Sequence, residues 1–262
     1  LIFIGVQADV AVGTGTIQVL AASVSGMFAQ LRRRAVDVKM GLFLVAGGFV
    51  GSGLGILLFQ WINRLGLIET FVVLAYVFFL GAVGILMFVE SARALVARAR
   101  PGVAGRARLH RHTWLHRLPF KLRFPISRLY ISALVPLVTG ASIGVLTALM
   151  GVGGGFILIP AMVYLIGMPA SVVVGTSLFQ LSLVSAMSGF LHAYTNQTVD
   201  IVLALLLIAG GVIGAQFGSR AGVHLRGEQL RVLLALLVLG VCGRLAYDLV
   251  ATPADPFSLA TG

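Results

Sequence analysis

The chain has 262 residues, of which 59% are apolar and only 10% are charged. Soluble domains average about 45–50% apolar and about 25% charged residues, so this composition excludes a soluble enzyme, a soluble nucleic-acid-binding protein and a disordered chain. Uncharged runs cover 10–31, 40–63, 70–89 and 201–219, and no Asp, Glu, Lys or Arg occurs over 129–199. Because one bilayer span needs roughly 20 apolar residues, the sequence predicts an all-α polytopic membrane protein.

The apolar runs predict helices near residues 9–31, 38–62, 67–89, 170–194, 199–219 and 229–250. The remaining run, 131–167, is too long for one span, because the rise of about 1.5 Å per residue would carry it well beyond a core of about 30 Å. Five residues in its middle, 151–155, read Gly-Val-Gly-Gly-Gly, and Pro160 follows. Glycine and proline interrupt helices, so we expect two shorter helices, one on each side of the glycines.

The net charge of +11 is concentrated in one segment. Ten of the 19 Lys and Arg residues lie within 91–128, which contains no acid. Because basic loops resist translocation, this segment is predicted to be a cytoplasmic loop rather than a nucleic-acid-binding surface. Trp114, Phe120 and Phe124 are interleaved with its charges, a pattern that also allows contact with anionic lipid headgroups.

The chain repeats itself at an offset of 162 to 163 residues. Val12-Gly13-Thr14-x-x-x-Gln18 reappears at 174–180 as Val-Gly-Thr-x-x-x-Gln, and Val36-Asp37 reappears at 199–200. Four glycines in each half also match: Gly47, Gly48, Gly51 and Gly55 with Gly210, Gly211, Gly214 and Gly218. We therefore expect two homologous repeats, each built around a broken glycine-rich helix.

The repeats suggest a division into a first transmembrane repeat (1–90), the basic loop (91–128), a second repeat (129–251) and a C-terminal tail (252–262). The first repeat has no counterpart of 136–162, so it is expected to be incomplete at its N-terminus, either as a fragment or as a short natural variant. The distribution of Arg residues favours a hairpin over 131–167, and hence inverted repeats. Four spans per repeat in parallel orientation remain the alternative.

Two groups of residues are candidates for a binding site. The first is Gly153, Gly154 and Gly155, whose backbone N–H groups could receive an anion at the start of a helix, although a tight hairpin would explain them equally well. The second group consists of polar side chains in repeated positions: Thr176, Ser177, Gln180, Thr14 and Gln18. These residues could replace part of an anion's hydration shell, or could instead form interhelical hydrogen bonds.

The glycine spacing i, i+4, i+8 predicts helix packing at Gly47, Gly51 and Gly55, and again at Gly210, Gly214 and Gly218. No catalytic triad, no pair of intramembrane carboxylates and no metal-ligand spacing is visible in the sequence. An enzyme is therefore not expected, and no cofactor or metal is assigned.

The motif Gly-Val-Gly-Gly-Gly-Phe at 151–156 with Pro160, followed by Gly-Thr-Ser at 175–177, resembles the TauE/SafE family of membrane transporters. This resemblance implies a bacterial inner-membrane permease that exports sulfite, sulfoacetate or related organic anions. The family's glycine motif normally occurs in both repeats, whereas this chain has only the second copy and reads Gly13-Thr14-Gly15 in the first.

The function expected from these features is a secondary transporter of small anions that works by alternating access between its repeats. The alternative is a non-transporting membrane protein, an assembly partner or a sensor that acts through the basic loop. The sequence identifies neither the anion nor the oligomeric state.

Overall fold

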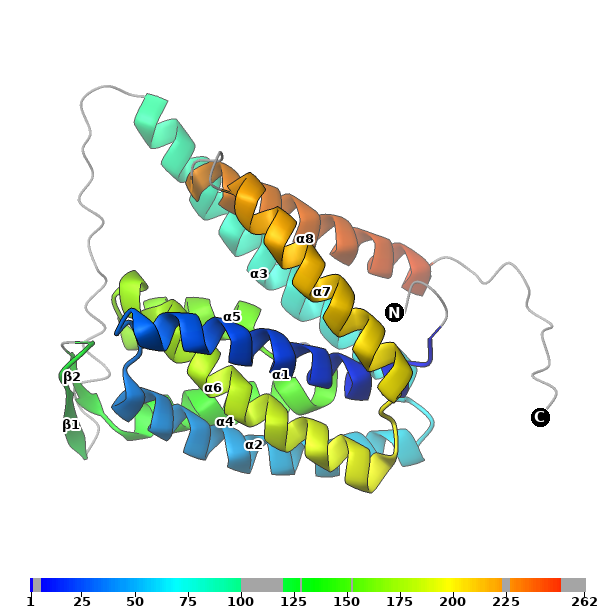
Figure 1. Ribbon diagram of the computed structural model, residues 1–262. Helices are drawn as coiled ribbons and strands as arrows, with labels where there is room; N and C mark the ends of the chain where they lie inside the picture. The colour runs from blue at the N-terminus through cyan, green and yellow to red at the C-terminus, as the bar shows by residue number, and fades with distance from the viewer. Residues whose placement is uncertain (2–5, 100–119, 128, 152, 223–226, 251–262) are drawn as a thin grey trace. The chain divides into compact units, whose positions relative to one another are not determined.

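The computed structural model describes residues 1, 6–99, 120–127, 129–151, 153–222 and 227–250 (Figure 1). Its helices and strands are, in chain order, α1 (Ala8–Arg32), α2 (Val38–Arg64), α3 (Ile68–Ala99), β1 (Lys121–Phe124), β2 (Leu129–Ser132), α4 (Leu134–Met150), α5 (Gly155–Ala161), η3 (Met162–Ile166), α6 (Ala170–Leu191), η4 (His192–Asn196), α7 (Ile201–Gly222) and α8 (Gly227–Val250). The chain forms two compact units, one of residues 1–69 and 105–220 and the other of 70–104 and 221–262.

The helices predicted from the apolar runs are present, and each begins within two residues of its expected start. Four described helical segments are long and apolar enough to cross a membrane: Ala8–Arg32, Val38–Arg64, Ile68–Val89 and Val172–Asn196. Shorter apolar helices cover Leu134–Met150, Ile201–Gly211 and Ala235–Tyr247. Many large apolar side chains on these helices are exposed, among them Val50 at 62% and Ile201 at 72%, as expected where lipid rather than water surrounds the protein.

Two parts of the segment predicted to be a basic loop form regular secondary structure instead. Helix α3 continues to Ala99, because 91–99 is rich in Ala, Arg and Leu, which are strong helix formers. Residues 121–132 form an antiparallel hairpin in which Phe124 pairs with Leu129 and Lys121 with Ser132. The hairpin forms because its apolar residues alternate with exposed ones, and it is a short addition to a described chain that is otherwise mostly helical, as predicted.

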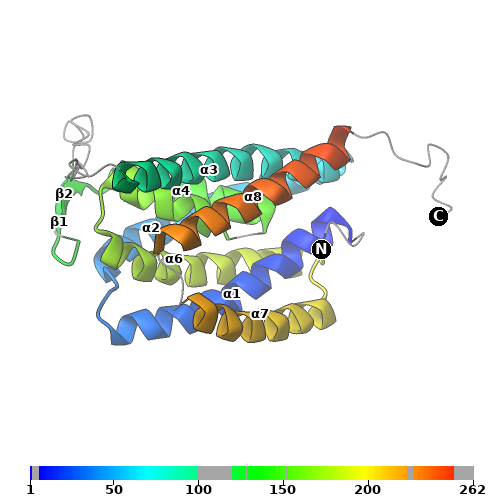
Figure 2. The same ribbon diagram turned by 90° about the horizontal axis from the view of Figure 1, so that it is seen from above.

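Helix α6 is the centre of the first unit. Figure 2 shows it lying between α1 on one side and α2 and α4 on the other. It runs antiparallel to α1: the Cδ1 atom of Leu178 would lie 2.9 Å from a Cβ at Gly26, and, farther along α6, Gly189 lies against Ile17. The contacts with α2 are made by Phe179 against Gly41 and, further along both helices, by Val184 against Gly48.

Helices α2 and α4 run parallel and touch backbone to backbone. A Cβ placed at Gly47 or Gly51 would collide with the carbonyl oxygen of Leu137 or Ala141, and one at Gly55 would lie 2.9 Å from the oxygen of Val145. The contact is mutual, because Gly140 and Gly144 of α4 lie equally close to carbonyls of α2. Such close approach of two helices requires small residues at the interface.

The segment 134–166 enters the first unit and returns to the end where it began. Helix α4 ends at Met150, and the chain turns through Gly151, Gly153 and Gly154, all three with positive φ, a conformation that residues with a Cβ rarely adopt. Helix α5 and the π-helix η3 then lead back. Phe124 and Ile131, which precede α4, belong to the same buried apolar cluster as Ile166, the last residue of η3, and Met168 beyond it.

In the second unit, α3 packs against α8. Cys242 donates its thiol hydrogen to the carbonyl of Val77 at 3.3 Å, and Gly84 lies against Leu239. The predicted tail 252–262 and most of the basic loop lie outside the described residues.

The contact between α2 and α4 predicts opposite outcomes for two neighbouring glycines. Gly51→Ala should lower the free energy of unfolding by about 1–3 kcal/mol, because the added methyl collides with the carbonyl of Ala141. Gly53, whose Cβ position has no described atom within 4 Å, is the matched control, and Gly53→Ala should raise stability by about 0.5–1 kcal/mol. Unfolding of both variants in detergent tests the contact, and equal losses would contradict it.

Candidate binding site

The glycine turn, defined here by Gly151, Gly153 and Gly154, lies against the middle of α1 and α6. A Cβ at Gly153 would meet the side chains of Val19 on α1 and Leu181 on α6. Gly151 lies against the backbone of Val12. Because Val19 and Leu181 are both close to the middle of their helices, the turn lies deep inside the first unit.

The two repeated threonines, Thr14 and Thr176, are completely buried and accept hydrogen bonds from distant backbone groups. The N–H of Asp37 donates to Thr176 Oγ1 at 3.0 Å, and the N–H of Asp200 donates to Thr14 Oγ1 at 3.1 Å. Each threonine therefore binds the residue that precedes a helix in the other half of the sequence. Both contacts tie the start of a helix to a helix from the other half of the chain.

The glycines beside these threonines make a second pair of matching contacts. Gly13 lies against Thr198, with 2.8 Å from its Cβ position to the carbonyl oxygen, and Gly175 lies against the carbonyl of Ala35. Ala35 and Thr198 are themselves 163 residues apart. Both the threonine hydrogen bond and the glycine contact therefore occur twice, each time between a residue of one half and the matching partner in the other half.

The two repeated glutamines occupy comparable places with different surroundings. Gln180 is 0% exposed, and neither its Oε1 nor its Nε2 has a hydrogen-bond partner among the described residues. Its Nε2 would lie 3.2 Å from a Cβ at Gly48, and Gln18 Nε2 would lie 3.4 Å from one at Gly211. Gln18 is half-buried. Ser177, the other predicted residue, donates to the carbonyl of Val174 at 2.9 Å.

The remaining predicted glycines divide into two groups. Gly155 lies 2.8 Å, measured from its Cβ position, from Leu181 Cδ1, so it belongs with the glycine turn. Gly210 and Gly214 have no described atom within 4 Å of their Cβ positions, and the surroundings of Gly218 lie outside the described residues. The structure thus brings Gly47, Gly51 and Gly55 against another helix but does not place Gly210 or Gly214 in such a contact.

Three buried polar residues were missed from the sequence. Ser185 and Ser188 are 0% exposed and Thr198 is 7% exposed, and none of their hydroxyls has a partner among the described residues. Ser185 and Ser188 share a helix face with Leu181 and His192, because the four are spaced by four, three and four residues. That spacing was visible in the sequence, but it does not distinguish a free hydroxyl from one bonded within its own helix.

His192 is fully buried and fully bonded. Its Nε2 lies 2.8 Å from the carbonyl oxygen of Ala148, and its Nδ1 lies 3.2 Å from the amide nitrogen of Asn196. The ring of Phe59 meets the imidazole edge-on with centroids 4.9 Å apart. Gln60 extends the chain by donating to Asn196 at 3.1 Å. His192, at the end of α6, is thus hydrogen-bonded to the last turn of α4.

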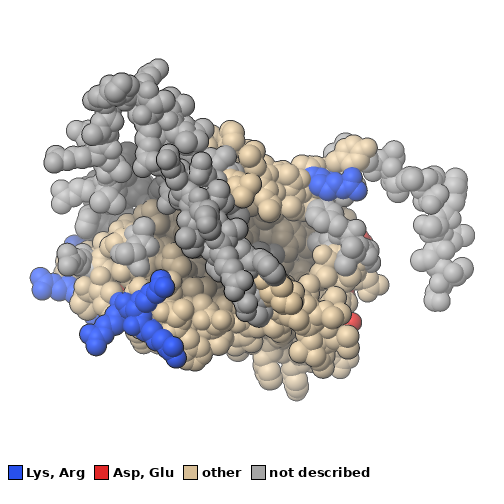
Figure 3. All heavy atoms as spheres, turned by 45° about the horizontal axis from the view of Figure 1, so that its top comes forward, with Lys and Arg blue, Asp and Glu red and all other residues tan. Residues whose placement is uncertain are grey.

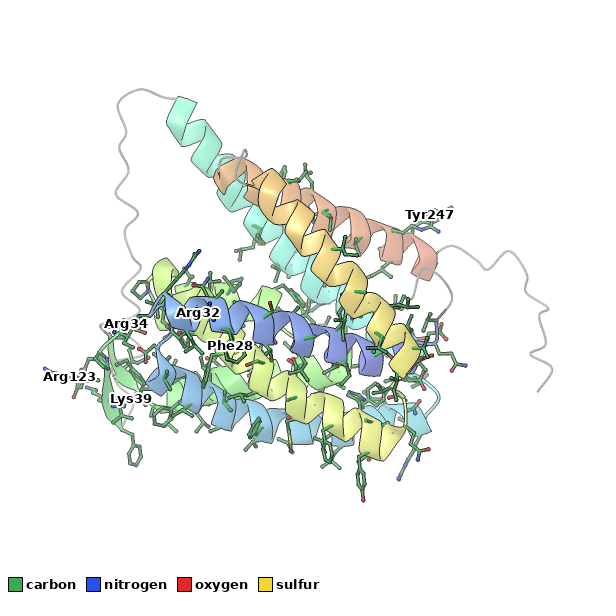
Figure 4. The ribbon with its side chains drawn as sticks, in the orientation of Figure 1. Phe28, Arg32, Arg34, Lys39, Arg123 and Tyr247 are labelled. Carbon is green, nitrogen blue, oxygen red and sulfur yellow. The ribbon has the colours of Figure 1, made fainter. Side chains whose placement is uncertain are left out.

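Basic side chains gather at the end of the first unit where α1 ends and α2 begins (Figure 3). Arg32, Arg34, Lys39 and Arg123 come from α1, the following turn, α2 and β1 (Figure 4). Lys39 donates from Nζ to the carbonyl of Arg123 at 3.0 Å and lies 5.7 Å from the ring centre of Phe124.

Beneath this basic end, Asp37 is 1% exposed and joins three elements. Its Oδ1 accepts from the N–H of Met40, and its Oδ2 accepts from the N–H and the hydroxyl of Ser127, at 3.0 and 2.6 Å. Its counterpart Asp200 is exposed and caps α7 through Leu203 at 3.0 Å. Within the described ranges, no group of three or more His, Cys, Asp or Glu residues lies together as metal ligands would.

Long apolar helices, exposed apolar surfaces and a helix pair that turns back inside the unit define a multi-pass membrane protein. The sequence model of one family, Sulfite exporter TauE/SafE, matches residues 1–245. The chain therefore belongs to the TauE/SafE family, and the resemblance seen in its motifs is confirmed.

Curated relatives carry names of the same class. The chain is 25% identical to the "Probable membrane transporter protein YunE" of Bacillus subtilis, over 94% of this chain and 84% of that protein. It is 24% identical to the "Probable membrane transporter protein YjnA" of the same organism, over 91% and 85% of the two chains. A "Probable membrane transporter protein" of Xylella fastidiosa is 25% identical over 92% and 83%. No solved structure gives a significant match.

The hydrogen bond between Asp37 and Thr176 can be tested by substitution at the threonine. Thr176→Val should lower the free energy of unfolding by about 1–3 kcal/mol, because it leaves the buried N–H of Asp37 without an acceptor. Thr176→Ser keeps an acceptor and should lose much less. Unfolding of both variants in detergent checks this, and equal losses would show that the hydroxyl is not the stabilising group.

The difference between the two aspartates gives a second test. Asp200→Ala removes an exposed helix cap and should cost about 1 kcal/mol of unfolding free energy. Asp37→Ala should cost more, by about 1–3 kcal/mol, because both donors of Ser127 are also left unpaired in a buried place. A double-mutant cycle with Ser127→Ala measures the share of that extra cost that comes from the Ser127 hydroxyl, and a coupling energy near zero would contradict the role given to Asp37.

Proposed function

We propose that this protein is a secondary transporter of small anions, such as sulfite or organosulfonates, and that it works by alternating access between two inverted repeats. The family description, Sulfite exporter TauE/SafE, supports the substrate class. The names of the relatives support the transporter class. Three features of the molecule also support the proposal: the repeats, their orientation and one buried amide.

The repeats are supported by contacts that recur when the halves are exchanged. Thr14 binds the N–H of Asp200, and Thr176 binds the N–H of Asp37. The threonine of each half therefore bonds to the aspartate of the other half, and the matching residues lie 162 to 163 positions apart. Two homologous repeats that pack against each other would produce this pair of matching bonds, whereas unrelated helices would not.

The inverted orientation is supported by the course of the chain. Helix α1 runs antiparallel to α6, its proposed counterpart, and the segment 134–166 returns to the end where it began. This end carries exposed Arg and Lys residues (Figure 4), so the positive-inside rule assigns it to the cytoplasm. The proposed location is accordingly the bacterial inner membrane. Contact of anionic headgroups with the loop 91–128 also stays a proposal, since most of that loop lies outside the described residues.

The single observation that carries the proposed site is Gln180. A buried amide with both polar atoms unpaired is unfavourable by itself, and Gln180 lies near the middle of α6, with its Nε2 3.2 Å from the Cβ position of Gly48 on α2. No charged side chain occurs over 129–199. We therefore propose that an anion is held by neutral donors: Gln180 and the backbone at Gly153, Gly154 and Gly155, with Thr176, Ser177, Thr14 and Gln18 completing the site. No cofactor or catalytic residue is part of the proposal.

Reconstitution tests this function directly. The wild-type protein in proteoliposomes should carry labelled sulfite or sulfoacetate down a gradient, at a rate that rises with protein and saturates with anion. Gln180→Met keeps the length of the side chain and removes its amide, so flux should fall at least about tenfold, as expected for a lost hydrogen bond to a charged group.

The control for this experiment is Gln7→Met, at an exposed glutamine just before α1, which should leave flux unchanged. Wild-type vesicles that carry none of these anions would contradict transport of this substrate class. In that case a sensor or an assembly partner acting through the basic loop would become the better hypothesis.

A further inference from the structure

Ser185 and Ser188 lie on a face of α6 whose two ends both contact the region around the end of α4 and the glycine turn. At one end, Leu181 contacts Gly155 and Gly153. At the other end, His192 Nε2 lies 2.8 Å from the carbonyl oxygen of Ala148. Leu181, Ser185, Ser188 and His192 follow one helix face, so the two serines face the end of α4 and the residues of the glycine turn that the structure describes.

Within the described part of the chain, the hydroxyls of these two serines have no hydrogen-bond partner, which is unusual for buried serines in a helix. Such hydroxyls normally donate to a carbonyl one turn earlier. In this protein Ser182 does so to the carbonyl of Phe179, at 2.9 Å, and Thr147 does so to Ile143, at 2.8 Å. Ser185 and Ser188 are 0% exposed, yet neither hydroxyl has a partner among the described residues. Their donors and acceptors are thus available to a bound molecule.

We propose that Ser185 and Ser188 contact the transported solute, and that their hydroxyls donate hydrogen bonds to an oxyanion held beside the glycine turn. This assignment rests on the proposed function and adds two specificity-determining residues to it. A cation is the less suitable ligand, because no carboxylate occurs anywhere over 129–199. An oxyanion offers several acceptors to hydroxyl and backbone N–H donors without requiring a fixed charge in the membrane.

The proposal predicts that stability and transport change in opposite directions. Ser185→Ala and Ser188→Ala remove a buried hydroxyl that has no partner, so each variant should unfold at a slightly higher temperature in detergent without anion. Each should also raise the KM for labelled sulfite about tenfold in proteoliposomes, with flux normalised to reconstituted protein. A purely structural serine would not produce this combination.

Ser182→Ala is the matched control, since Ser182 is a buried serine of the same helix whose hydroxyl is already bonded to Phe179. It should leave the KM within about twofold of wild type. Wild-type flux combined with an unchanged KM in both Ser185→Ala and Ser188→Ala would overturn this assignment alone. Absence of any sulfite or sulfoacetate flux in the wild type would overturn the proposed function and this assignment with it.

Discussion

Two hydrogen bonds that link the halves of the chain hold the first unit together. A backbone N–H at the start of a helix has no partner within that helix. The N–H groups of Asp37 and Asp200 are in this situation, and each is satisfied by a threonine from the opposite half. The starts of α2 and α7 are thereby tied to α6 and α1, and the antiparallel pairing of α1 with α6 follows from both bonds at once.

Close packing around this pair depends on glycine. Between α2 and α4, and between α1 and its neighbours, backbone atoms lie where a single methyl group would not fit. Several of the buried hydroxyls are bonded within their own helices, as those of Thr16 and Thr147 are. Against that background the unpaired groups of Gln180, Ser185 and Ser188 are conspicuous. A protein that retains such unfavourable groups in one helix gives up stability there, which is the usual property of a binding site.

Much of the fold could be predicted from the sequence, because apolar runs and glycines report the helices and their ends directly. The repeated Thr14 and Thr176 were found by comparing the halves, but their partners lie 186 and 139 residues away in sequence, and no local pattern reveals such pairs. Ser185 and Ser188 were missed because a serine that bonds within its helix looks the same in sequence as one that does not. The hairpin over 121–132 was missed because its many basic residues hid the alternation of Leu122 and Phe124 with exposed positions.

The most direct test of the central claim, that the segment 134–166 returns to its starting side, is thiol labelling from each face of the membrane. With Cys242, the one cysteine, replaced by serine, single cysteines at exposed positions 34, 65 and 169 can be treated with an impermeant reagent in oriented vesicles. Arg34→Cys and Pro169→Cys should react from the same side, and Leu65→Cys, at the far end of α2, from the opposite side. Reaction of position 169 from the same side as position 65 would contradict the inverted arrangement.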